Sequence, residues 1–134
     1  MKKLTPEQIL HEARFWEGMC FDPGHSAYLP ADSLRWEAEA DFDLTRISGF
    51  SDGRYDHLFH AQQDVCAEVC GSENEATQYF DDMCRAIQVS TIEPIFIVEG
   101  TDRRFWVWEG NHRTGMAHVL EVSTMPAYVG YQPV

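Results

Sequence analysis

The segment 105–113 constrains the fold more than any other part of the chain, and it reads FWVWEGNHR. Its apolar run at 105–108 favours a buried strand. The run ends close to Gly110, and a helical pattern follows, since Met116, Val119 and Leu120 recur at helical spacing. The segment therefore predicts a strand that turns tightly into the start of a helix.

A helix start of this kind is suited to binding an anion. The first backbone N–H groups and the positive end of the helix dipole point at one place, where a phosphate fits. His112 and Arg113 add side-chain donors there, and an Arg can grip a phosphate with two hydrogen bonds. The sequence leaves a second interpretation open, in which His112 and Arg113 only cap the helix and form ion pairs within the fold.

The charge of the chain limits its partners. Its 134 residues carry 22 acidic and 10 basic side chains, which gives a formal net charge of −12 at pH 7. Binding to DNA phosphates needs clustered Lys and Arg, so DNA is not expected as a ligand. The acidity favours solubility, and it also allows a surface that docks on a basic protein partner or mimics nucleic acid.

The length and hydropathy indicate one cytoplasmic domain. A chain of 134 residues can bury one hydrophobic core. It has no apolar stretch that could cross a bilayer, and the basic residues at 2–3 are not followed by the apolar segment of a secretory signal. We therefore expect a cytoplasmic protein without a membrane partner.

The chain has four cysteines, and none lies in a CxxC pair. In the cytoplasm these thiols would stay reduced. Cys66 and Cys70 lie four residues apart on an expected helix, and with His57 and His60 they could in principle hold zinc. The spacing is not that of the usual zinc sites, so we expect buried, apolar cysteines and keep the metal site as the alternative.

The N-terminal part predicts a helix, a loop and a short strand. Thr5 and Gln8 form a capping-box pattern for a helix that ends near residue 20. The segment 21–35 predicts a loop, because it contains two prolines and a glycine. Residues 41–47 alternate between polar and apolar, which indicates a half-buried strand.

Phe15 and Trp16 are neighbours on the first expected helix. One narrow apolar stripe cannot bury both rings. We therefore expect one of them to contact a partner or a second copy of the chain in a homodimer.

The remaining patterns complete an α+β domain with a small mixed sheet and helices packed on it. Both strands of an expected hairpin are apolar on both faces, so helices should cover both sides of the sheet. We assign residues 1–40 to an N-terminal extension and 41–134 to the main domain, within one compact unit. The further expected elements are helices at 56–70 and 72–87, hairpin strands at 95–98 and 105–108, and a last strand at 126–129.

The order of these elements resembles the ParB/sulfiredoxin superfamily, in which a strand runs into a Gly-x-His-Arg helix start. In this chain the motif is Gly110-Asn111-His112-Arg113, with the segments 94–98 and 124–129 on either side. The resemblance covers about residues 76–130. It implies that a nucleotide or phosphate group binds at Gly110, Asn111, His112, Arg113 and Thr114.

The chain departs from the family pattern at several points. Sulfiredoxins have a reactive cysteine where this chain has Asn111, so sulfinic acid repair by that route is not expected. Partition proteins of the family add a DNA-binding domain, for which this chain has no room. A kinase of the family needs a carboxylate near the phosphate, and Glu109 is adjacent in sequence. Other carboxylates lie near or within the strand expected at 41–47, and spacing singles out none of the candidates: Glu109, Glu37, Glu39, Asp41 and Asp43.

The resemblance and the charge lead to three hypotheses. The first is a domain that binds ATP or ADP with Mg²⁺, or another phosphorylated small molecule, and performs phosphoryl transfer or nucleotide hydrolysis with His112, Arg113 and Glu109 as catalytic residues. The second is a non-enzymatic acidic inhibitor, of the kind found in mobile elements, that docks on a basic partner. The third, a ParB-like nuclease, ranks last because the acidic field would repel its substrate.

Overall fold

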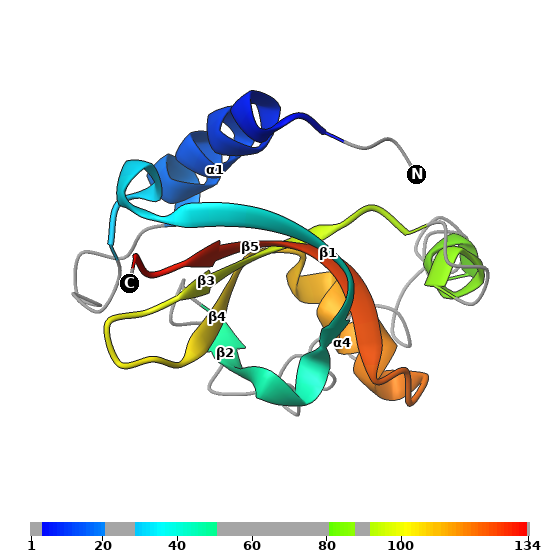
Figure 1. Ribbon diagram of the computed structural model, residues 1–134. Coiled ribbons are helices and arrows are strands. Elements are labelled where there is room, and N and C mark those ends of the chain that lie inside the picture. Colours follow the sequence, from blue (N-terminus) through cyan, green and yellow to red (C-terminus); the bar gives the residue numbers. More distant parts are fainter. Residues whose placement is uncertain (1–3, 21–28, 51–80, 88–91, 134) are drawn as a thin grey trace.

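The computed structural model describes residues 4–20, 29–50, 81–87 and 92–133. These residues form an α+β fold around one mixed sheet of five strands, which confirms the expected class. Figure 1 shows α1 on one face of the sheet and α4 on the other. The elements are α1 (Pro6–Cys20), β1 (Arg35–Asp43), β2 (Ile47–Phe50), β3 (Ile95–Glu99), β4 (Phe105–Glu109), α4 (Asn111–Val119), β5 (Thr124–Tyr131), and a helical segment at 81–87.

The strands lie in the order β1-β5-β3-β4-β2, so β3 is central and β1 and β2 are the edges. The predicted hairpin is confirmed, because β3 and β4 pair antiparallel. β5 pairs parallel with β3 and antiparallel with β1, and β2 pairs parallel with β4. β1 runs across the position between residues 40 and 41, so residues 35–40 belong to the same sheet as the strands after them.

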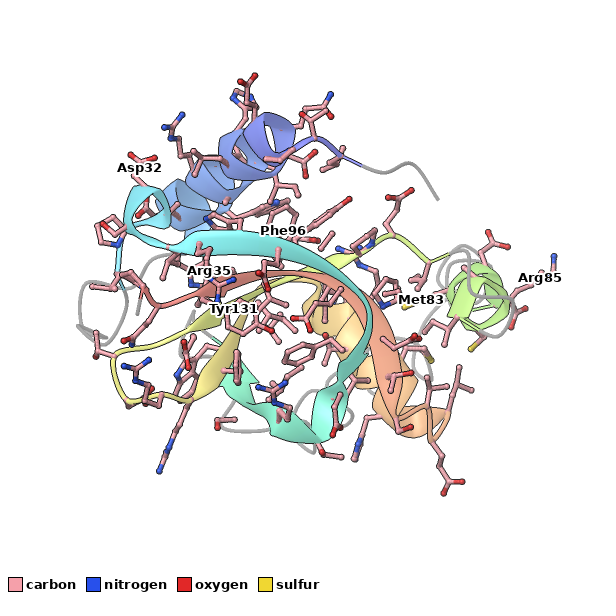
Figure 2. All side chains as sticks on the ribbon, viewed as in Figure 1. Asp32, Arg35, Met83, Arg85, Phe96 and Tyr131 are labelled. Carbon is pink, nitrogen blue, oxygen red and sulfur yellow. The ribbon has the colours of Figure 1, made fainter. Side chains whose placement is uncertain are left out.

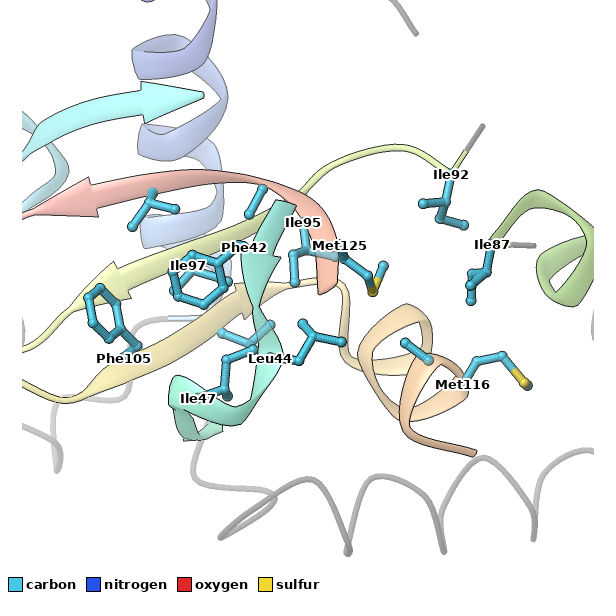
Figure 3. Close-up of a cluster of buried hydrophobic side chains, with 14 of the residues drawn as sticks. Phe42, Leu44, Ile47, Ile87, Ile92, Ile95, Ile97, Phe105, Met116 and Met125 are labelled. Carbon is cyan, nitrogen blue, oxygen red and sulfur yellow. The ribbon is translucent and has the colours of Figure 1, made fainter. Parts of the chain in front are cut away.

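Alternate side chains of the central strands enter two hydrophobic clusters, one on each face of the sheet. Ile95 and Ile97 of β3 join the cluster toward α4, shown in Figure 3. Phe96 and Val98 of the same strand join the cluster toward α1. The expectation that both faces of the hairpin are covered is therefore confirmed.

The first helix begins and packs as the sequence predicts. Thr5 and Gln8 exchange two hydrogen bonds, of 2.9 and 3.2 Å, which is the expected capping box. Trp16 packs against the cluster under α1, whereas Phe15 remains 56% exposed. The two neighbouring rings thus have different environments, as the single apolar stripe requires.

The predicted strand at 41–47 is wrong at both ends. β1 begins six residues earlier and ends at Asp43, a 3-10 turn follows at Leu44–Arg46, and β2 begins at Ile47. The Asp43 side chain accepts the Thr45 backbone N–H at 2.9 Å, which begins the turn. Within the expected loop at 21–35, residues 29–30 and 34 are irregular, Ala31–Ser33 form a short 3-10 helix (η1), and Arg35 already belongs to β1.

A β-bulge interrupts the regular alternation of the two faces along β1. Glu39 pairs with Ala127 and Phe42 pairs with Met125, so two residues of β1 oppose the single residue Pro126. Proline has no N–H for the ladder, and an extra residue in the partner strand accommodates it. The bulge turns Phe42 to the α4 side of the sheet, whereas Trp36 faces the α1 side.

Several expectations lie outside the described residues. They are the helix at 56–70, the start of the helix at 72–87, and the zinc alternative with His57, His60, Cys66 and Cys70. Residues 81–87, the last part of the helix expected at 72–87, are described and are helical. Among the described helices, none has the length and apolar character needed to cross a bilayer.

Tyr131 connects the last strand to the acidic edge strand. Its hydroxyl donates to the Glu39 carboxylate, and the Arg35 guanidinium lies 5.1 Å from its ring centroid. Figure 2 shows Arg35 and Tyr131 next to each other on the sheet. Burial, and then the contact with Glu39, raise the pKa of Tyr131 to about 12.

We expect Tyr131 to make folding sensitive to alkaline pH. Its pKa is raised in the folded state, so its stabilising contribution is complete below the unfolded value of about 10 and is lost as the pH rises toward 12. Urea denaturation should show a larger loss of stability from about pH 9 to about pH 11.5 for the wild type than for Tyr131→Phe. Equal losses in the two proteins would contradict the assignment.

Candidate functional site

Gly110 forms the junction between β4 and α4. It is the N-cap of α4 with φ 109° and ψ 31°, a left-handed conformation that side chains disfavour. A Cβ at this position would lie 2.3 Å from Cγ2 of Ile95. The backbone of Gly110 therefore turns in direct contact with the central strand, and only glycine fits there.

We expect Gly110→Ala to destabilise the protein by roughly 2–5 kcal/mol. About 1–2 kcal/mol comes from the left-handed backbone and the rest from the clash with Ile95. Gly18→Ala is the matched control, because a Cβ on this exposed position of α1 meets nothing within 4 Å. The control should gain about 0.5–1 kcal/mol in urea denaturation, since alanine favours a helix. A similar effect of both substitutions would refute the steric argument.

Arg113 ties the first turn of α4 to the segment before β3. Its Nη1 donates to the carbonyl oxygens of Glu93 at 2.8 Å and Pro94 at 3.1 Å. Its Nη2 donates to the Glu109 carboxylate, and the two side chains are 16% and 23% exposed. For Arg113, the structure thus shows the alternative that the sequence left open, an ion pair within the fold.

We expect Arg113→Lys to destabilise the protein by about 1–3 kcal/mol. A lysine keeps the charge but cannot reach two carbonyls and a carboxylate with one planar group. Arg103→Lys is the control, because Arg103 is 66% exposed and lies 3.8 Å from Glu99. In urea denaturation the control should stay within about 0.5 kcal/mol of the wild type. A loss as large for Arg103→Lys would contradict a special role of Arg113.

The other predicted residues surround the same turn. Thr114 is fully buried, and its hydroxyl donates to the Gly110 carbonyl at 2.7 Å, beside the helical hydrogen bond from its own N–H at 2.8 Å. Asn111 is the first residue of α4, and His112 is partly buried in its first turn. The N-cap of α4 is Gly110, which has no side chain to bond the first backbone N–H groups of the helix.

A cavity of about 700 Å³ lies beside this turn. That volume is typical of sites for small molecules. Glu109 and Arg113 form part of its wall at the α4 end. The remaining lining comes from α1, segment 81–87 and the central strands, through Leu4, Glu12, Trp16, Asp82, Met83, Ala86, Ile92, Glu93, Pro94, Phe96 and Tyr128.

Sequence reasoning missed most of this cavity. Glu12 and Trp16 come from α1, and Phe96 and Tyr128 come from two neighbouring strands. No local pattern joins residues so far apart along the chain, and the contact between α1 and the sheet creates the site. In the described residues, no group of three or more acidic, His or Cys side chains is arranged to hold a metal ion.

Comparison with known proteins finds no matching family model, no matching curated protein and no matching solved structure. The function must therefore be argued from the geometry of the turn and of the cavity beside it.

Proposed function

We propose that the protein binds the phosphate group of a nucleotide or of another phosphorylated small molecule at the N-terminus of α4. The observation that carries this proposal is the uncapped helix start at the left-handed Gly110, beside a cavity of about 700 Å³. The backbone N–H groups at 111–113 and the helix dipole supply positive potential there. The resemblance of the GNHR turn to the ParB/sulfiredoxin superfamily supports the same ligand class.

Arg113 would have to change partners to hold the phosphate. Its guanidinium contacts the Glu109 carboxylate and two backbone carbonyls, so an incoming phosphate competes with Glu109 for Nη2. Mg²⁺ commonly binds through one or two carboxylates together with substrate phosphates. Glu109 fits that donor set as the carboxylate nearest the turn, and such an ion would supply charge neutralisation.

Chemistry at a bound phosphate would use the same side chains. With ATP, hydrolysis consumes one water molecule and releases ADP and inorganic phosphate. Arg113 and His112 would stabilise the negative charge that develops on the transferred group. Glu109 would orient the water or take up its proton.

A thermal-shift screen tests the proposal with ATP, ADP, CTP, GTP and inorganic phosphate, each with and without Mg²⁺. A ligand at about 100 times its dissociation constant stabilises the folded state by about 2.7 kcal/mol, which corresponds to a shift of several degrees. We expect at least one ligand to produce such a shift in the wild type. The shift of each variant is measured against its own ligand-free protein, so a change in basal stability does not matter.

Two variants should change phosphate binding in opposite directions. Glu109→Gln removes the competitor for Arg113 and should strengthen phosphate binding in the absence of Mg²⁺, whereas Arg113→Gln should weaken it. Arg103→Gln is the matched control, because it removes an exposed guanidinium from the β3–β4 turn. No shift with any ligand, or equal shifts in Arg113→Gln and Arg103→Gln, would overturn the proposal.

A further inference from the structure

The charge of the cavity points to a ligand that the phosphate proposal does not cover. Four carboxylates line it, from Glu12, Asp82, Glu93 and Glu109, against the one guanidinium of Arg113. That guanidinium already contacts Glu109. Among the described residues, no side chain forms an ion pair with Glu12 or Glu93.

The floor of the cavity is apolar and aromatic. Phe96 is 2% exposed and Tyr128 4% exposed, and their ring centroids lie 5.2 Å apart. Trp16 lines the cavity from α1, and Figure 2 shows Phe96 under that helix. Glu12 and Glu93 are exposed, so they form a rim above this floor.

We propose that this cavity binds a small organic cation, with an ammonium or guanidinium head and an apolar body. The carboxylates of Glu12 and Glu93 attract the positive head, because opposite charges are most effective beside a low-dielectric wall. The ring of Trp16 adds attraction for a cation near its face. The apolar body packs over the partly exposed ring of Trp16 and displaces water from it.

The size of the cavity favours a small molecule over a protein surface. A volume of about 700 Å³ is within the range of sites that enclose most of a small ligand. Its lining comes from α1, segment 81–87, strands β3, β4 and β5, and α4, so a bound ligand would contact several elements. This inference concerns the same cavity as the phosphate proposal, but it rests on Glu12, Glu93 and the aromatic floor rather than on Gly110, so either proposal can fail without the other.

Three probes of nearly equal shape test the charge preference on the wild-type protein. They are 1-naphthylmethylammonium, 1-naphthalenemethanol and 1-naphthoate, which carry a positive, a neutral and a negative head on the same ring. Two-dimensional NMR of the tryptophan indole N–H groups follows binding, with the Trp16 signal assigned through Trp16→Phe. We expect the cation to bind most tightly and the anion least tightly, with the Trp16 signal shifting most.

Substitution of the rim carboxylates tests which residues attract the head. Glu12→Gln with Glu93→Gln should weaken binding of the cation by roughly fivefold and leave the neutral probe unchanged, as expected for two exposed charges. Glu7→Gln with Glu121→Gln is the matched control, because it removes the same charge from exposed positions outside the cavity lining. Raising the salt concentration should weaken binding of the cation to the wild type and to the control pair.

Defined results would overturn this inference. Equal affinity for the three probes would indicate an apolar cavity that does not select charge. Tighter binding of the anion would show a preference for negative charge. Equal weakening by the rim pair and the control pair would place the attraction elsewhere on the protein.

The test also separates this inference from the phosphate proposal. Glu109→Gln should strengthen phosphate binding but weaken binding of the cation. The substitution leaves the positive charge of Arg113 in the cavity wall without its carboxylate partner. Leu4 lines the cavity, and Lys2 and Lys3 precede it in the sequence. Tighter binding of the cation in Lys2→Ser with Lys3→Ser would support a site that selects positive charge, whereas weaker binding would count against it.

Discussion

Gly110 joins β4 to α4 through a left-handed backbone conformation, and its missing side chain sets the position of both elements. The central strand passes so close that Ile95 occupies the place of a Cβ. From the first turn of α4, Arg113 reaches back to the carbonyls before that strand, and Thr114 closes the turn on Gly110 itself. One left-handed residue thus brings β3, β4 and α4 together, and the side chains of Glu109 and Arg113 on either side of it line the cavity.

The parts of the fold that the sequence predicts depend on neighbours along the chain. The capping box of α1, the β3–β4 hairpin and the strand-to-helix turn are all local, and all are confirmed. The start of β1 depends instead on residues that are distant in the sequence. Residues 35–40 alternate between charged and apolar residues, but they pair with β5 residues that lie more than eighty positions later, and so does Pro126, which explains the bulge.

The same distinction holds for the candidate site. Six consecutive residues, 109–114, could be selected from their order alone, and the structure places them at the turn beside the cavity. The contact of Arg113 with Glu93 and Pro94 could not be predicted, because nothing in the sequence sets the path of the chain before β3. The rim and the floor of the cavity need α1 packed on the sheet, a tertiary contact that no spacing encodes.

Acidic side chains have different effects at the edge of the sheet and at the cavity. On β1 the exposed Glu37 and Asp41 lie along an edge strand, where charge discourages pairing with another chain. At the cavity the same kind of side chain sets ligand preference, and Glu109 connects the two proposed sites. A phosphate that draws Arg113 away from Glu109 returns one negative charge to the cavity and adds its own. By thermodynamic linkage, the two proposals together require that a phosphate and an organic cation strengthen each other's binding.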